Sequence, residues 1–501
     1  MRTAEEYIDS LKHLNTKIFA FGKELEHFTE DPLIRPHINA AAMTYHLAHD
    51  PDGEDLLCAT SHLSGKKINR FTHIHQNADD LVKKVKMLRF ISHRTGTCYQ
   101  RCVGFDAINA VYATTYDMDQ KLGTDYHERM KQYVLHLQET DNMVAGSMTD
   151  AKGDRNLRPH QQPDPDQYVR VVDRNSDGIV IRGAKLHQTG IVNSHEMLIM
   201  PTVAMGPEDS DYAVSCAVPV DMPGVIHIFG RQTNDTRKYD RVDQGNVCFG
   251  IVGGEALTVL EDVFVPWERV FMCGEVDFAG LLVERFASYH RQNYGGCKGG
   301  VSDVIIGATY AALEQIGVHK ASHVRDKLTE MIHLSETLYS CSLACSSEGR
   351  PTASGAYFVD PLLANVCKQN VTRFIYEIAR ISHDLAGGLL ATMPSEKDME
   401  NSQVGDLVVK YLAGTESVDQ HDRYRILRLL ENMTGGTALV ESMHGAGSPQ
   451  AQRVMILRQG DLDNKKKLAL NLAGIFEPGE SRCFLPKEAR NGCHCSYKGD
   501  V

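Results

Sequence analysis

The sequence lacks any apolar run long enough to cross a membrane, since a spanning helix needs about 18 or more consecutive apolar residues and no such run occurs. It also lacks the apolar core of a secretory signal, since its first residues, MRTAEEYIDSLKHLNTKIFAFGKELEHF, are polar and amphipathic. Positive charge is in short supply, and the net charge is −12. Counterion release from a nucleic-acid backbone needs a basic surface, so we expect no nucleic-acid partner. These absences predict a cytoplasmic protein that neither enters a membrane nor binds nucleic acid.

A regular disulfide framework is also absent. The 13 cysteines are odd in number and irregularly spaced along a chain of 501 residues. Small secreted scaffolds use even numbers of cysteines at regular spacing, which this pattern does not match. We therefore expect a reduced intracellular protein in which some thiolates bind a metal.

Hydrophobic periodicity changes twice along the chain and predicts an α+β multidomain protein. Residues 1–143 show apolar residues at three-and-four spacing, typical of a helical domain. Residues 144–277 are strand-like, and YVRVVDRNSDGIVIRGAK has the alternation and turn residues of a hairpin, so we expect an antiparallel β-domain. Residues 278–475 return to helical periodicity, and residues 476–501 form a tail. Helices, a β-domain and further helices are the arrangement of the acyl-CoA dehydrogenase fold, a likeness that by itself implies no chemistry.

The stretch ERFASYHRQNYGGCKGG, residues 284–300, crowds reactive side chains around two glycines. It contains His290, Tyr294, Cys297 and Lys298. Each glycine costs about 1 kcal/mol relative to alanine inside a helix, so the pair argues against a helix interior. Glycine lets a backbone approach a bound group closely, which predicts a ligand beside Cys297.

A second set of thiols lies in TCYQRC, where Cys98 and Cys102 are four residues apart. In a helical stretch this spacing would place both thiols on one face. Together with Cys297 and His290 they form a set of three thiolates and one imidazole, which suits zinc or an iron–sulfur cluster. A C-x₃-C pair on a helix is more often core packing, and we prefer that reading for the same spacing in SCSLAC.

These segments, together with MTDAKGDR, RGAKLHQTG, AGGLLATMPSE and ESMHGAGSPQAQR, resemble the 4-hydroxybutyryl-CoA dehydratase family from residue 1 to about residue 475. Related flavin monooxygenases of the 4-hydroxyphenylacetate hydroxylase type share the general fold. The resemblance implies FAD and a [4Fe–4S] cluster bound by Cys98, Cys102, His290 and Cys297. It also implies dehydration of 4-hydroxybutyryl-CoA to crotonyl-CoA, with isomerisation of vinylacetyl-CoA to crotonyl-CoA as a second activity.

The implied dehydration is radical chemistry because of where the hydrogen leaves. The C3 hydrogen is β to the thioester and is not acidic enough for a side-chain base. Removal of one electron to the flavin makes that hydrogen far more acidic, and the electron is later returned.

The resemblance also implies roles for individual side chains. The iron bound by His290 would act as a Lewis acid for the departing hydroxyl, and a detached His290 could act as a base. Tyr294 would donate toward the hydroxyl, and Lys298 would act electrostatically at the thioester or the cluster. Glu441 and Glu255 match catalytic and site-lining glutamates. Without the resemblance, we would expect Tyr294 to form a buried hydrogen bond and Lys298 to be a solvated charge. Glu441 and Glu255 would be surface or helix-cap carboxylates.

No G-x-G-x-x-G fingerprint is present, so no Rossmann phosphate cradle is expected. The resemblance instead places FAD against the β-domain and next to a neighbouring subunit, which implies a homotetramer built as a dimer of dimers. The residues expected at the flavin in the β-domain are Met148, Thr149, Lys152, Gln188 and Thr189. Those expected to reach the FAD of the neighbouring subunit are Gly387, Gly388 and Lys320.

Two other functions compete with this interpretation. A flavin monooxygenase that oxidises a phenol would gain nothing from four cluster ligands. A zinc-stabilised structural protein would not explain the glycine-lined loops. In the tail, Cys493 and Cys495 could bind a metal or be two surface thiols.

Overall fold

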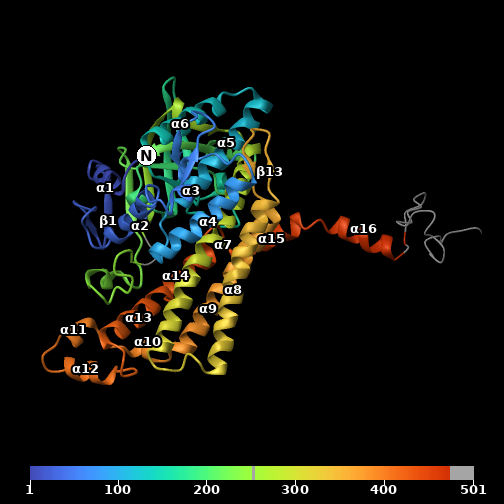
Figure 1. Cartoon of the computed structure of the whole chain (residues 1–501). Coiled ribbons are helices and arrows are strands. Elements are labelled where there is room, and N and C mark those ends of the chain that lie inside the picture. The colour runs from blue at the N-terminus through green and yellow to red at the C-terminus, as the bar shows by residue number, and fades with distance from the viewer. Residues whose placement is uncertain (251–253, 474, 476–501) are drawn as a thin grey trace, which may run out of the picture.

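The longest helix, α7 (Val276–Glu314), connects the two parts of the molecule: it begins beside the sheets and runs through the helical bundle (Figure 1). The computed structural model describes residues 1–250, 254–473 and 475. Cys493 and Cys495 therefore lie outside the described residues. Within the described part, no helix is long and apolar enough to cross a membrane.

The N-terminal third is mainly helical, as the periodicity predicts. Its helices are α1 (Ala4–Lys12), α2 (Arg35–His46), α3 (Glu54–Leu57), α4 (Ala78–Thr95), α5 (Cys102–Leu122) and α6 (Tyr126–Thr140). Four short strands interrupt them: β1 (Ile18–Ala20), β2 (Lys23–Glu24), β3 (Cys58–Thr60) and β4 (Lys67–Asn69). Strand β1 pairs with the adjacent β2 and also, in parallel, with a strand some two hundred residues later, and local periodicity could not reveal the second partner.

Two sheets form the β-region. Their remaining strands are β5 (Val144–Ser147), β6 (Arg170–Arg174), β7 (Gly178–Thr189), β8 (Glu196–Ile199), β9 (Val214–Pro219), β10 (Val225–Phe229), β11 (Glu255–Pro266) and β12 (Val270–Cys273). The six-stranded sheet has the order β2-β1-β10-β11-β7-β6, and the four-stranded sheet has the order β12-β9-β8-β5. The predicted hairpin is confirmed as the antiparallel pair β6–β7. The expected antiparallel pairing holds for most strands of this region. The exceptions are β5–β8 and the pairing of β10 with the N-terminal strand β1, which are parallel across long connections.

The bundle consists of α7, α8 (Ser322–Ser347) and α9 (Pro361–Ala386), with a short hairpin of β13 (Arg350–Pro351) and β14 (Tyr357–Phe358). Smaller helices follow: α10 (Leu389–Thr392), α11 (Glu396–Met399), α12 (Gly405–Tyr411), α13 (Gln420–Met433), α14 (Gly436–His444), α15 (Pro449–Gln459) and α16 (Leu462–Leu472). Figure 1 shows α16 extending away from the rest of the molecule. Our division at residues 143, 277 and 475 stays a prediction.

The glycine pair of the opening segment lies inside α7, so the expectation that it interrupts a helix is wrong. A Cβ at Gly295 would collide with the backbone oxygen of Leu338 in α8. A Cβ at Gly296 would lie 2.6 Å from the backbone oxygen of Val85 in α4. The glycines therefore let three helices approach closely, and this packing offsets their poor helix propensity.

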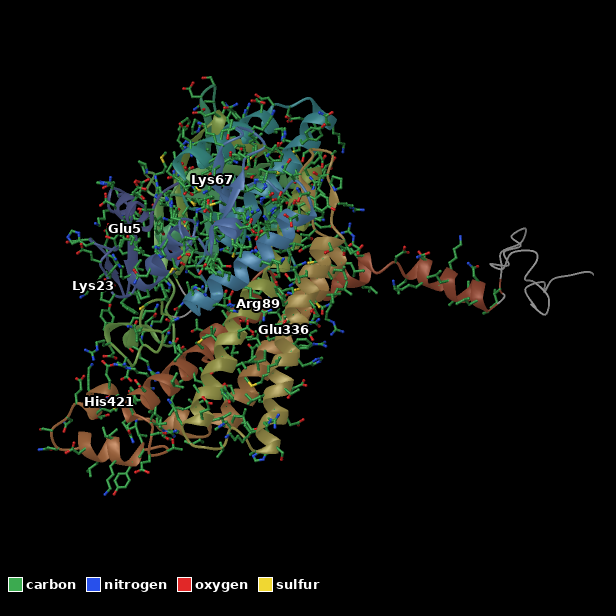
Figure 2. All side chains as sticks on the ribbon, in the orientation of Figure 1. Glu5, Lys23, Lys67, Arg89, Glu336 and His421 are labelled. Carbon is green, nitrogen blue, oxygen red and sulfur yellow. The ribbon has the colours of Figure 1, made fainter. Side chains whose placement is uncertain are left out.

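Ion pairs reinforce the same helix contact. Arg89 of α4 binds Asp303 of α7, with Nε 2.8 Å from Oδ2, and Glu336 of α8, with Nη2 2.5 Å from Oε1. Figure 2 shows Arg89 and Glu336 side by side where α4 meets α8. The segment that carries the predicted site is thus held between two helices along its length.

Candidate active site

Three thiols gather where the α4–α5 connection meets α7. Cys297 lies within α7 and Cys102 is the first residue of α5, whereas Cys98 lies in the preceding connection. The prediction that Cys98 and Cys102 share one helix is wrong, because Gln100 between them has a φ of 65°. Burial raises the pKa of Cys102, and the charges of Cys98, Asp106 and Cys297 raise it further, so the three thiols are close enough to interact electrostatically.

Burial dominates the acid–base behaviour of these thiols. It raises the pKa of Cys98 to about 12 and that of Cys297 to about 11, while the Lys298 ammonium opposes both shifts. Burial likewise raises the pKa of Cys102 well above its usual range. As free groups the thiols stay protonated at neutral pH, and a bound cation would convert them to thiolates.

His290 is oriented by a buried ion pair. Its Nδ1 lies 2.8 Å from Oδ2 of Asp106, and Oδ1 of Asp106 lies 2.5 Å from the ammonium of Lys84. Asp106 and Lys84 have no exposed surface. A carboxylate paired with an ammonium accepts hydrogen bonds, so Nδ1 of His290 donates and Nε2 keeps its lone pair. Metal-binding histidines commonly donate their other nitrogen to a carboxylate in this way.

Thiolates and imidazole are the donor types that bind iron in iron–sulfur clusters, so the chemistry of these four side chains is compatible with one. Among residues 1–250, 254–473 and 475, no three His, Cys, Asp or Glu side chains converge closely enough to share one metal ion. Ligands of a cluster bind different iron atoms and therefore stand farther apart. The rings of His290 and Tyr294 meet edge to face at 5.6 Å. Burial raises the pKa of Tyr294, and the nearby charges of Glu441 and the three thiols raise it further.

Tyr294, Lys298 and Glu441 form one hydrogen-bonded group. The Tyr294 hydroxyl donates to Oε1 of Glu441 at 3.3 Å, and the Lys298 ammonium donates to Oε2. Burial opposes ionisation of Glu441, but the charge of Lys298 holds its pKa below the ordinary value. Gly445 is required here, because a Cβ at that position would collide with the Tyr294 hydroxyl.

Glu255 is the first residue of β11 and pairs in register with Thr189 of β7. The Thr189 hydroxyl donates to Oε1 of Glu255 at 3.3 Å. Burial and the nearby charge of Glu441 raise the pKa of Glu255 to about 7. The two glutamates thus have pKa values shifted in opposite directions, the usual arrangement of a base and an acid in one site.

The β-region residues predicted at FAD lie on two adjoining segments. The backbone oxygen of Met148 accepts from Lys185 Nζ at 2.9 Å, and that of Thr149 accepts from the Leu186 amide at 2.7 Å. Gln188 is buried, and its Oε1 has no hydrogen-bond partner among the described residues. A buried acceptor of this kind suits an N–H group of a flavin ring.

Lys152 and His187 lie on the β-region side of the site. The Lys152 backbone has a φ of 71°, and burial lowers the pKa of its side chain. Burial and the charges of Lys152 and His444 lower the pKa of His187, so the β-region loops and the helix that carries Glu441 face one another.

The remaining residues predicted at FAD lie elsewhere in the same chain. Lys320 is exposed between α7 and α8, and Gly387 and Gly388 are exposed just after α9. They share the far end of the bundle (Figure 1) and do not meet the β-region set within one chain.

Sequence reasoning missed Asp106 and two buried cations, Lys368 and Arg291. A signal existed for Asp106, which lies in the apolar segment CVGFDAINAV four residues after Cys102. The signal for Lys368, in LANVCKQNV, was weaker: it is a lysine on the apolar side of a helix.

Comparisons with known proteins agree along the whole chain. Residues 3–272 match the family model described as 4-hydroxyphenylacetate 3-hydroxylase N terminal, and residues 279–474 match the corresponding C-terminal model. The chain is 55% identical over 490 residues to the 4-hydroxybutyryl-CoA dehydratase/vinylacetyl-CoA-Δ-isomerase of Clostridium aminobutyricum, covering 95% of this chain and 100% of that protein.

Solved structures give the same result. The archaeal oxygen-tolerant 4-hydroxybutyryl-CoA dehydratase from N. maritimus superposes with a TM-score of 0.93 and 48% identity, covering 98% of this chain and 99% of that one. The oxygenase component of 4-hydroxyphenylacetate 3-monooxygenase, complexed with FAD, superposes with a TM-score of 0.81 at 22% identity, covering 94% and 99%. Glutaryl-coenzyme A dehydrogenase reaches a TM-score of only 0.50 at 11% identity, covering 82% and 84%. The predicted acyl-CoA dehydrogenase likeness is therefore a distant one.

Proposed function

The chain belongs to the 4-hydroxyphenylacetate 3-hydroxylase family and, within it, groups with the 4-hydroxybutyryl-CoA dehydratases; from this premise we propose that it converts 4-hydroxybutyryl-CoA to crotonyl-CoA and isomerises vinylacetyl-CoA to crotonyl-CoA. One observation supports this above all. Tyr294, Lys298 and Glu441 form a proton-transfer group directly beside the thiol cluster.

Two cofactors complete the proposal. FAD would be bound in the β-region by Met148, Thr149, Lys152, Gln188 and Thr189, and when bound it supplies a reversible one-electron acceptor. The [4Fe–4S] cluster would be bound by Cys98, Cys102, Cys297 and His290, and when bound it supplies a Lewis acid for the departing hydroxyl.

The carboxylates divide the proton transfers. Glu441 is held ionised by Lys298 and is the base for the C2 proton, which the neighbouring thioester acidifies. Glu255, with a pKa of about 7, is partly protonated at neutral pH and can return a proton. Tyr294 donates toward the leaving hydroxyl of the substrate, and His290 offers an Nε2 lone pair for a ligand or base role.

The alternative, an aromatic monooxygenase without a cluster, has weaker support. The 4-hydroxyphenylacetate 3-monooxygenase oxygenase component of Thermus thermophilus is only 25% identical to this chain. That function also leaves three neighbouring thiols, Cys98, Cys102 and Cys297, without a role.

We also propose a homotetramer, a dimer of dimers, in which Lys320, Gly387 and Gly388 complete the FAD site of a neighbouring subunit. Their exposure at the far end of the bundle supports this arrangement. Cytoplasmic location is supported by the ten cysteines of the described residues, which are all free.

Anaerobically purified protein tests the main proposal. With 4-hydroxybutyryl-CoA it should form crotonyl-CoA, followed by liquid chromatography, and iron, acid-labile sulfide and flavin should co-purify. Hydroxylation of 4-hydroxyphenylacetate with reduced flavin and oxygen, without crotonyl-CoA formation, would establish the alternative.

A further inference from the structure

Lys368 of α9 is completely buried and points into the group formed by Tyr294 and Glu441. Its ammonium donates to the backbone oxygen of Ser442 and lies 3.5 Å from that of Met443. It also lies 3.8 Å from the centroid of the Tyr294 ring. One cation thus contacts the two residues after Glu441 and the ring whose hydroxyl binds Glu441.

These contacts are strong for physical reasons. Ser442 and Met443 are in the last turn of α14, where carbonyl groups have no intrahelical donor and carry partial negative charge. A buried ammonium there satisfies both carbonyls and favours the helix end. The aromatic face of Tyr294 attracts the same charge, and desolvation strengthens that attraction.

A second buried cation holds the chain just beyond the helix. Nε of Arg291 donates to the backbone oxygen of Ala446 at 3.1 Å, and its Nη1 donates to Oδ1 of Asn365 at 2.6 Å. Ala446 and Gly447 both have positive φ, 60° and 96°, so this turn is held in an uncommon conformation. Lys368 of α9 and Arg291 of α7 therefore bind the backbone on the C-terminal side of Glu441.

We propose that Lys368 is a positioning residue that fixes Glu441 relative to Tyr294 for proton transfer. Its meaning for catalysis rests on the proposed function, whereas its effect on α14 does not. Among the described residues, Lys368 forms no hydrogen bond with the thiols or the flavin segments, so it acts through Tyr294 and Glu441, which it positions.

The contact between the Lys368 ammonium and α14 depends on pH. Burial lowers the pKa of Lys368 to about 7; Glu441 of α14 and Cys297 of α7 oppose this shift, and the cations Lys298 and Arg291 of α7 reinforce it. The ammonium is therefore lost as the pH rises through neutrality, and the hold on α14 weakens above that pH.

The activity test uses vinylacetyl-CoA isomerisation by the holoenzyme, which requires no hydroxyl departure. Lys368→Met should lower kcat by ~10²-fold, the cost of a misplaced catalytic group, with KM nearly unchanged. It should also make the fall in kcat above neutral pH shallower, because only the deprotonation of Glu255 would then contribute, whereas a variant damaged only in folding would keep the wild-type shape. Lys368→Arg should recover much of kcat and, because arginine stays charged, show the same shallower fall. Arg380→Met removes an exposed cation from the same helix and should change nothing.

Hydrogen exchange of the same proteins, measured by mass spectrometry, separates this proposal from the proposed function. Exchange in residues 436–447 should be faster in Lys368→Met than in wild type and unchanged in Arg380→Met. If Lys368→Met does not fold, the wild-type protein still tests the proposal. After correction for the intrinsic pH dependence of exchange, the exchange rate in residues 436–447 should rise above neutral pH. Absence of isomerisation in wild type would contradict the proposed function alone. Unchanged exchange in residues 436–447 and a kcat within twofold of wild type would overturn the role of Lys368.

Discussion

The Nδ1 atom of His290 lies 2.8 Å from the carboxylate of Asp106, whose other oxygen pairs with Lys84. This pair joins α4, α5 and α7 and fixes the tautomer that leaves Nε2 of His290 able to bind iron. Asn293 adds a third hydrogen bond, from Nδ2 to Asp106 Oδ2 at 2.5 Å. The proposed metal ligand is thus oriented by Asp106, Lys84 and Asn293, which are not themselves proposed ligands.

The first prediction is that Asp106→Asn will lower the iron affinity about 10–100-fold, the usual effect of losing such a partner. Iron and acid-labile sulfide per chain measure it. The substitution also leaves Lys84 buried and unpaired, which costs about 3–5 kcal/mol of stability. Asp106→Asn combined with Lys84→Met removes both charges and should recover stability but not iron. Recovery of iron in the double variant would show that Asp106 serves the fold and not His290.

The helices and the hairpin could be predicted because their patterns are local. The uninterrupted α7 could not, because Gly295 and Gly296 are explained by backbone from α4 and α8, distant in sequence. The parallel pairing of β1 with β10 escaped prediction for the same reason, since β10 follows some two hundred residues later.

The site divides in the same way. Cys297, Tyr294 and Lys298 could be singled out because they share one short segment. Lys368 could not, because its importance comes from contacts with Tyr294 and with α14, which only the folded chain brings together.

The second prediction concerns the cluster ligands. His290→Cys supplies a fourth thiolate and should retain iron while dehydration falls, because the imidazole is the proposed labile ligand. Cys297→Ala should lose iron and activity together. Cys345→Ala, a buried cysteine of the SCSLAC segment, is the control and should retain both. Full dehydration by His290→Cys would contradict a special role for the imidazole.

The third prediction follows from the pKa of Glu255, about 7 in the folded protein against about 4.5 in the unfolded chain. The folded state holds this proton more tightly, so the stabilisation is fully present below about pH 4.5 and is lost as pH rises through 7. Wild type should therefore lose up to about 3 kcal/mol relative to Glu255→Gln across that range. Denaturation of the two proteins at several pH values measures the difference. The exposed control Glu26→Gln should give no such trend. If the difference in unfolding free energy between wild type and Glu255→Gln did not change with pH, Glu255 would be ionised throughout the range.

The fourth prediction tests the subunit interface. Among the described residues, no atom lies within 4 Å of the position where a Cβ of Gly388 would stand. Gly388→Leu should therefore leave the single chain folded but lower flavin content, measured by absorbance, if a neighbour's FAD lies there. Gly307→Leu, at another exposed glycine with an open Cβ position, is the control. Normal flavin content in Gly388→Leu would exclude this position from the cofactor site.

The last prediction separates proton movement from water loss. Isomerisation of vinylacetyl-CoA needs a base and a proton donor but no departing hydroxyl. Glu441→Gln keeps the size of the side chain and removes its basicity, so both reactions should fall together. Tyr294→Phe removes a donor to the leaving hydroxyl, which typically costs ~10²–10³-fold in rate, and should impair dehydration more. Because the Tyr294 hydroxyl also donates to Glu441, a smaller loss of isomerisation should accompany it.

The ratio of the two rates in Tyr294→Phe is therefore the decisive measurement, with flavin and iron content as controls for folding. Glu441→Gln should leave the ratio near that of wild type, and Tyr294→Phe should shift it at least tenfold toward isomerisation. A tenfold shift corresponds to about 1.4 kcal/mol in transition-state free energy, well above the difference expected from a general loss of order. An equal fall in both reactions would instead make Tyr294 a partner of Glu441 in proton transfer, and the leaving hydroxyl would need another donor.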